Sequence, residues 1–247
     1  MSEPVTSVPA ESEQILNWLR EGESRFIGTV DGLTDDELQA DSGLPEWSRA
    51  HVAAHVARNA EAMSRLLTWA LTGEEKSMYP DVESRNRDIA TSAGQSPEAL
   101  RGDVRATSAQ FDADVVALPA AAWTARVRTF QGREIPASAT LWMRAREVWL
   151  HLVDLDAGMS VESWPGELVD TLLDEVTATM SAGDDPPRWL LEATDRERTW
   201  QIGGAAGQAI EQEISGKAAD LLAWLTGRSA GAGLATEGVL PTPPHWM

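Results

Sequence analysis

Apolar residues recur at helical spacing in four segments of the first 158 residues: 11–30, 48–71, 97–118 and 141–155. Side chains three or four positions apart share one face of a helix, so each segment predicts an amphipathic helix. Ser48 is a suitable N-cap, Pro97 occupies the favoured first helical position, and Gly73 ends the second helix. Four helices with one interruption predict an antiparallel, up-down four-helix bundle.

The interruption and the second half of the chain follow other patterns. Residues 123–136 contain a short alternation and the turn Gln131-Gly132, which predict a hairpin-like excursion or an ordered loop. After Gly158 the pattern predicts a helix over 164–180, strands over 189–194, 198–202 and 211–215, a helix over 217–225 and an extended tail. The expected fold class is α+β multidomain, with a helical domain over 1–158 and a small α+β domain over 159–247.

Composition and charge exclude several classes of partner. The 247 residues carry a net charge of −19, whereas a nucleic-acid or anionic membrane surface requires clustered Lys and Arg. The first residues, Met1-Ser2-Glu3-Pro4, lack the basic and apolar regions of a signal peptide, and no apolar run approaches the roughly 18 residues of a spanning helix. We therefore expect a cytoplasmic protein, either a monomer or a small homo-oligomer, that binds neither nucleic acid nor membrane.

The chain contains no cysteine. This excludes disulfides, cysteine-ligated zinc and iron–sulfur sites, and a protein thiol as nucleophile. Any metal must be held by histidine and carboxylate, and any thiol must come from another molecule.

Glu147 and His151 are the strongest candidates for chemistry. They lie four residues apart on one predicted helix, about 40° apart around its axis, so both side chains can point at one atom. His51 and His55 have the same spacing on another predicted helix. Packing the two helices face to face creates a pocket with the ligand types of a divalent metal site, and a His₂Glu set leaves coordination positions open, as in catalytic zinc sites.

Structural alternatives exist for each candidate. His151 could be a hydrogen-bonded core histidine, and Glu147 a solvated charge or the ion-pair partner of Arg144. His51, in the first helical turn, is expected near solvent, whereas His55 lies one turn deeper between valines and alanines and is the better ligand candidate. His245, in a proline-rich tail, is expected to be exposed.

In the order of these motifs the sequence resembles the mycothiol-dependent maleylpyruvate isomerases of actinobacteria. The resemblance rests on Trp47-Ser48-x₂-His51-x₃-His55, Arg146-Glu147-Val148-Trp149-x-His151-x-Val153-Asp154-Leu155, Thr72-Gly73-Glu74-Glu75, Gln131-Gly132-Arg133 and Pro243-Pro244-x-Trp246. Members of this family place a DinB-like four-helix bundle before a C-terminal domain similar to sterol-carrier proteins. The match covers nearly the whole chain, and the segment around Glu147 is its most specific part.

The resemblance implies that His55, Glu147 and His151 bind zinc or another divalent metal, and that His51 is not a ligand. Arg85 matches the family arginine that faces the metal pocket, and Arg228 matches one from the C-terminal domain, so both are implied catalytic and ligand-binding residues. On this basis we expect the two arginines on opposite walls of a cleft between the domains, with zinc at its base. As structural alternatives, Arg85 lies in a charged segment, and Arg228 could compensate the last carbonyls of its helix.

The implied activity is cis–trans isomerisation of maleylpyruvate to fumarylpyruvate in gentisate degradation. The thiolate of mycothiol adds to the conjugated double bond, the resulting single bond rotates, and elimination restores the alkene. The implied partners are therefore a small dicarboxylate and a low-molecular-weight thiol. Three alternatives remain open at this point: another mycothiol-dependent S-transferase, a metal-dependent hydrolase on the same scaffold, and a non-enzymatic carrier.

Overall fold

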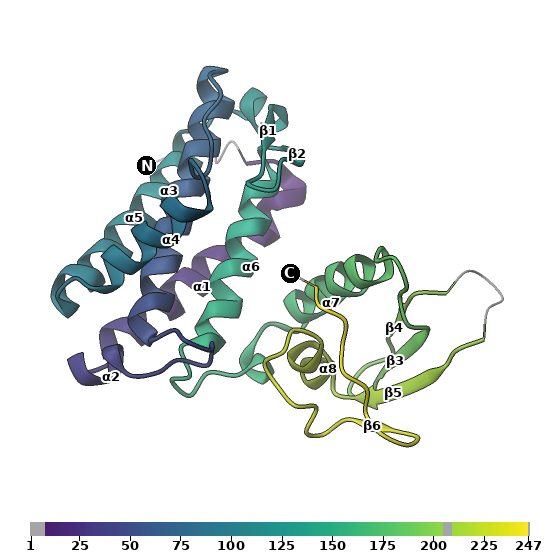
Figure 1. Ribbon diagram of the computed structural model, residues 1–247. Helices are drawn as coiled ribbons and strands as arrows, with labels where there is room; N and C mark the ends of the chain where they lie inside the picture. The colour runs from purple at the N-terminus through teal and green to yellow at the C-terminus, as the bar shows by residue number, and fades with distance from the viewer. Residues whose placement is uncertain (1–7, 205–208, 247) are drawn as a thin grey trace, which may run out of the picture. The chain divides into compact units, whose positions relative to one another are not determined.

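The computed structural model describes residues 8–204 and 209–246. These residues form two compact units, and the division between the units falls between Ala157 and Gly158. The first is helical and the second combines helices with a small sheet, which confirms the α+β fold class (Figure 1). The prediction made for Met1-Ser2-Glu3-Pro4 lies outside the described residues.

Long helices dominate the described part of the helical unit. Their bounds are α1 (Glu13–Gly32), α3 (Arg49–Thr72), α5 (Pro97–Ala117) and α6 (Ala139–Asp154). They correspond to the four predicted segments, and α1 packs on α6 and α5 while α3 packs on α5 and α6. The amphipathic periodicity located these helices because each buries one apolar stripe against its neighbours.

The predicted helix ends are confirmed at three positions. The Ser48 side chain accepts a hydrogen bond from the His51 backbone N–H at the start of α3, and Gly73, at φ 76°, terminates that helix in the left-handed conformation. Pro97 stands in the first turn of α5, where its missing N–H costs nothing.

The helical unit also contains elements that the periodicity did not predict. They are the 3₁₀ turns Ala10–Ser12 and Ala120–Thr124 and the helices α2 (Asp35–Gln39) and α4 (Val82–Ala93). Within the charged α4 segment only Ile89, Ser92 and Ala93 are buried, too few to produce a clear apolar stripe. The expected hairpin is present, as strand β1 (Arg126–Arg128) pairs antiparallel with β2 (Glu134–Pro136).

A buried arginine joins the long helices. Arg144, on α6, is fully buried and donates from Nε to Glu23 Oε1 of α1 at 3.0 Å and from Nη2 to Ser108 Oγ of α5 at 3.3 Å. Its Nη1 donates to the Val56 carbonyl and to Asn59 Oδ1 of α3, at 2.7 and 3.0 Å. Burial raises the pKa of Glu23, although the Arg144 charge opposes the rise. Arg144 is therefore not the partner of Glu147, and the sequence-based alternative that paired them is wrong.

Trp149 fixes α6 against α1. Its indole Nε1 donates to the Trp18 carbonyl at 2.9 Å, and the ring lies so close to Gly22 that a Cβ there would stand 2.7 Å from Nε1. Glycine is thus required at this crossing, because any larger residue would push α6 away from α1.

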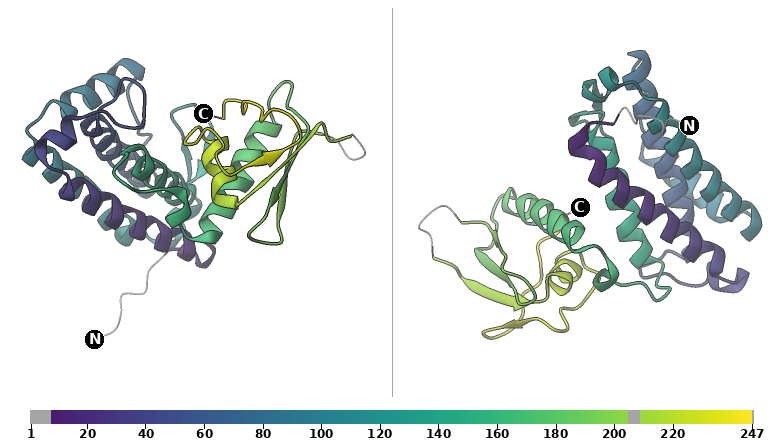
Figure 2. Two further views of the ribbon diagram at one scale, coloured as in Figure 1. Left: turned by 90° about the horizontal axis from the view of Figure 1, so that it is seen from below. Right: turned by 180° about the vertical axis from the view of Figure 1, so that it is seen from behind.

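The C-terminal unit is built on one small sheet. Its described elements are the 3₁₀ turn Val161–Ser163, α7 (Gly166–Ser181), β3 (Trp189–Ala193), β4 (Thr199–Ile202), β5 (Gln212–Gly216), α8 (Ala218–Leu225) and β6 (Ala235–Thr236). The strand order is β4-β3-β5-β6, with β3 and β5 parallel and the other two pairs antiparallel. Side chains alternate between exposed and buried along β4. The helices α7 and α8 pack on the sheet (Figure 2).

The predicted helices and first three strands of this unit are present, whereas β6 was not predicted. A strand of two residues carries too little alternation to be recognised. No helix among the described residues has the length and apolar character needed to cross a membrane.

The Arg144 network predicts a large stability effect. Replacing Arg144 with Met leaves the Glu23 carboxylate buried without its cation, so we expect the free energy of unfolding to fall by about 3–5 kcal/mol. The matched control is Arg20→Met, which removes a half-exposed ion pair with Asp112 and should cost no more than about 1 kcal/mol. Denaturant unfolding followed by tryptophan fluorescence measures both, and equal losses in the two variants would contradict the structural role of Arg144.

Candidate metal centre

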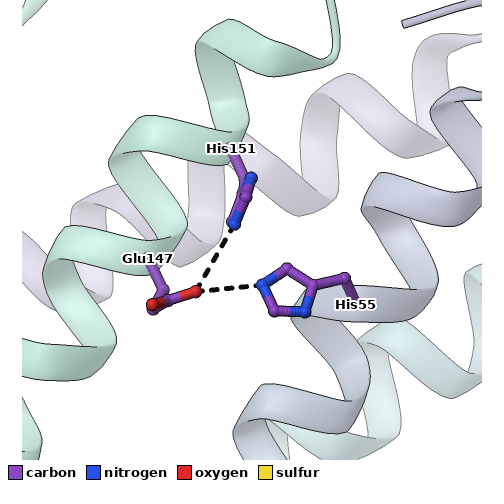
Figure 3. A group of neighbouring side chains, drawn as sticks. All are labelled: His55, Glu147 and His151. Carbon is purple, nitrogen blue, oxygen red and sulfur yellow. Dashed lines mark hydrogen bonds and ion pairs between the residues drawn. The ribbon is translucent and has the colours of Figure 1, made fainter. Parts of the chain in front are cut away.

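Three potential metal ligands converge between α3 and α6 (Figure 3). His55 Nε2 lies 3.0 Å from Glu147 Oε2, and His151 Nε2 lies 3.4 Å from the same oxygen. One ligand atom from each residue falls within 4.8 Å of the other two. The structure therefore brings together the three residues that the sequence analysis named as metal ligands.

The local structure explains this convergence. Glu147 and His151 are one turn apart on α6, so their side chains lie on the same face. His55 is 5% exposed and comes from the second turn of α3, which packs directly on α6. Because two of the three ligands share one helix, a single helix pair is enough to build the group.

Asp154 orients His151. The Asp154 carboxylate, 3% exposed, accepts a hydrogen bond from His151 Nδ1 at 2.9 Å. This contact fixes the ring and directs Nε2 toward Glu147. Carboxylates commonly hold metal-binding histidines in this way, because they select the tautomer and increase the basicity of the other nitrogen.

Arg85 contacts the other histidine of the group, His55, and acts there in the opposite sense to Asp154. Its Nη2 lies 3.2 Å from His55 Nδ1, and a guanidinium can only donate, so Nδ1 is the acceptor. The proton of the neutral ring is then on Nε2, which donates to Glu147. The Arg85 guanidinium also lies over the Tyr79 ring, 5.8 Å from its centroid, and burial raises the pKa of that phenol.

The pKa shifts within the cluster have opposite signs. Burial, together with the charge of His151, lowers the pKa of His55 to about 4. Burial also disfavours the charged forms of Glu147 and His151, but their hydrogen bonds outweigh it. The hydrogen bonds that Glu147 accepts from His151 and His55 hold the pKa of Glu147 well below its usual range. The hydrogen bonds of His151 to Asp154 and Glu147 raise the pKa of His151. At neutral pH the cluster thus combines a carboxylate with a neutral His55, and His151 keeps its proton to a higher pH than a free imidazole does.

This donor set fits a divalent metal. Two imidazole nitrogens and one carboxylate oxygen are the protein ligands of many catalytic zinc sites, and they leave coordination positions for other molecules. Several first-row ions accept the same ligands, so the residues define the site without selecting the ion.

The other candidate residues have distinct locations. His51 caps α3 through Ser48, in agreement with its expected structural role, and His245 is exposed, as expected. Arg228 belongs to the C-terminal unit, where its Nη1 donates to the Thr226 carbonyl at 2.7 Å at the end of α8. There it contributes to the lining of a cavity of about 590 Å³ together with Trp224 and Trp246.

Asp154 and Tyr79 are two residues at the site for which the sequence predicted no role. The spacing contained a signal for Asp154, which stands three residues after His151 on the same helix face. Tyr79 precedes α4, and no regular spacing relates it to the cluster.

Fold and site together define a class: a two-unit α+β protein whose helical unit presents a His₂Glu donor set. Comparison with known proteins narrows the class to one family. Residues 14–156 match the family model described as the mycothiol maleylpyruvate isomerase N-terminal domain, and residues 163–245 match the MDMPI C-terminal domain. The chain belongs to the mycothiol-dependent maleylpyruvate isomerase family.

Solved structures agree with this assignment. The crystal structure of a mycothiol-dependent maleylpyruvate isomerase is 34% identical in sequence, with a TM-score of 0.89 over 95% of this chain and 96% of that one. A variant of a mycothiol-dependent maleylpyruvate isomerase with one histidine replaced by alanine has a TM-score of 0.88 at the same identity and coverage. No curated protein matches the chain.

The contact between Asp154 and His151 predicts an effect on metal affinity. In Asp154→Asn the ring loses its charged acceptor, so we expect zinc affinity to fall about 10- to 100-fold, measured by competition with a chromophoric chelator. Asp156→Asn is the matched control, since Asp156 is exposed and its φ of 48° suits asparagine. Unchanged affinity in Asp154→Asn would show that Asp154 does not support the site.

The pKa directions predict how metal binding depends on pH. A metal must displace the proton held by His151, so affinity should rise about tenfold per pH unit until the pH passes the raised pKa of that residue, and then level off. His55, with a pKa of about 4, and Glu147 are already deprotonated above about pH 5 and add no dependence. Chelator competition between pH 5.5 and 8.5 measures the slope, and two protons displaced per metal would contradict this assignment.

Proposed function

We propose that the chain isomerises maleylpyruvate to fumarylpyruvate with the thiolate of mycothiol as a transient nucleophile. The thiolate sulfur forms a bond to one alkene carbon, and the electron pair of the double bond moves onto the conjugated carbonyl as an enolate. The remaining single bond rotates, the enolate expels the thiolate, and the trans alkene forms. No atom or electron is gained or lost overall.

The observation that carries this proposal is the group His55, Glu147 and His151 with Arg85 hydrogen-bonded to it. The absence of cysteine agrees with a nucleophile that comes from another molecule. When a divalent metal is bound, it supplies a positive charge that favours the thiolate over the thiol.

His55, Glu147 and His151 would hold that metal, and Asp154 would hold His151 in the required tautomer. His55 offers Nε2 as a ligand only with its own proton on Nδ1. The Nδ1–H cannot accept a hydrogen bond from Arg85, so the guanidinium is then available to another acceptor.

Arg85 provides a cation for one substrate carboxylate and for the enolate oxygen. A guanidinium binds a carboxylate through two parallel hydrogen bonds, which orients the substrate as well as attracting it. The chain carries a net charge of −19, so a dianion needs a local positive group to approach. Arg228 is proposed as the second carboxylate partner on the basis of the family resemblance.

The direct test follows the ultraviolet absorbance of maleylpyruvate in the presence of the zinc-loaded protein. Turnover should require both mycothiol and metal, and it should disappear after treatment with a chelator and return when zinc is added. Glutathione in place of mycothiol tests the choice of thiol. Turnover without any thiol would exclude the addition–elimination mechanism.

Arginine variants belong to the same experiment. Arg85→Ala and Arg228→Ala should each lower kcat/KM for maleylpyruvate at least tenfold, about 1.4 kcal/mol, while bound zinc stays near one per chain because neither side chain is a ligand. Arg87→Ala, on the exposed side of α4, is the matched control and should keep full activity. Unchanged turnover in Arg228→Ala would remove that residue from the proposal.

A further inference from the structure

A second cavity lies beside the metal cluster. It has a volume of about 350 Å³, at the small end of the range for ligand pockets. One wall is the segment before α3 and its first turn, with Glu46, Trp47 and His51, and the other is a face of α4 with Asn86, Ile89 and Ala90. The α4 residues are spaced three and four apart, so they share one side of the helix.

Two contacts connect this cavity with the cluster. The Trp47 and His55 rings pack in a T-shaped arrangement at a centroid distance of 5.6 Å. On the other wall, Arg85 connects the cavity with the cluster. Its Nη1 donates to Asn86 Oδ1 at 3.1 Å, and its Nη2 donates to His55. A molecule in the cavity is thus one side chain away from a metal ligand.

The wall that carries Trp47 is held in place before any ligand binds. Ser42 Oγ donates to the Trp47 carbonyl at 2.7 Å, and the Gly43 N–H donates to the Asp154 carbonyl at 2.8 Å, which ties this segment to the end of α6. Glu46 adopts a φ of 64°, rare for a residue with a side chain, where the chain turns into Trp47. A pre-formed wall lowers the entropic cost of binding.

The lining has the chemistry of a site for an uncharged, hydroxyl-rich molecule. The Ser48 backbone N–H donates to His51 Nδ1, so the neutral imidazole carries its proton on Nε2 and offers a donor. Glu46 offers acceptors and Asn86 offers both donors and acceptors, and Trp47 provides an apolar ring face. The six lining residues include one carboxylate and neither lysine nor arginine, which disfavours a dicarboxylate.

We propose that this cavity binds the sugar and inositol rings of mycothiol, a proposal that rests on the proposed function. Mycothiol joins N-acetylcysteine to a glucosamine–inositol unit, so it combines a thiol with two hydroxyl-rich rings. With those rings between Trp47 and Asn86, its thiol is directed toward the neighbouring metal ligands, and Arg85 is left to the dicarboxylate. The cavity therefore distinguishes mycothiol from smaller thiols.

The test is a substitution on the α4 wall that fills the cavity with a larger side chain. Ala90→Phe places a bulky ring in the cavity from an exposed position of α4 that lines it. Thr91→Phe is the matched control, because Thr91 is the next residue of α4, is exposed and lies outside the lining. The probe is S-methyl mycothiol, which cannot react, titrated calorimetrically into the full-length, zinc-loaded protein. We expect Ala90→Phe to raise its Kd at least tenfold and Thr91→Phe to leave it unchanged.

Turnover with N-acetylcysteine, which lacks both rings, gives the second readout. Ala90→Phe should lower kcat/KM for mycothiol at least tenfold and leave the value for N-acetylcysteine unchanged. Unaltered S-methyl mycothiol binding, no binding by the unmodified protein, or a rise only in the KM for maleylpyruvate would overturn the assignment. A different result would separate the two proposals. If the unmodified protein shows no isomerase turnover but binds S-methyl mycothiol, and Ala90→Phe loses that binding, the thiol site is supported and the proposed function is refuted.

Discussion

The helical unit depends on one buried guanidinium. Arg144 of α6 donates hydrogen bonds to α1, α3 and α5, so a single side chain sets the distance and rotation of α6 against each of them. A buried charge tolerates little displacement, because each lost hydrogen bond leaves a polar group without solvent. The position of Glu147 relative to His55 follows from this constraint.

Arg144 belongs to a polar stripe on the inward face of α6. Arg144, Glu147, His151 and Asp154 are spaced three, four and three residues apart, the spacing expected for one helix face. Each residue of this stripe has its own role. Arg144 fixes the packing, Glu147 and His151 present ligand atoms, and Asp154 orients His151. The candidate metal centre is thus continuous with the buried polar network of the core, which favours a fixed ligand geometry.

Much of the fold could be predicted from the sequence, since α1, α3, α5 and α6 each bury a regular apolar stripe. The three proposed ligands could also be found, because His55 is flanked by small apolar residues and Glu147 and His151 are one turn apart. The α4 helix could not be predicted, because its sequence is mostly charged and polar and the few residues it buries form no regular apolar stripe. That omission mattered, because α4 supplies Arg85 to the cluster and one wall of the adjoining cavity.

The sequence by itself determined the α+β class, the long helices and the histidine and glutamate candidates, because helix periodicity is a local property of the chain. It also identified the family. Only the tertiary structure decided the partners of the charged residues: Arg144 pairs with Glu23, 121 positions away, and not with Glu147 three positions on. Arg85 likewise reaches His55 across 30 positions. Such pairs depend on which charges are buried together, and burial is a property of the packed helices.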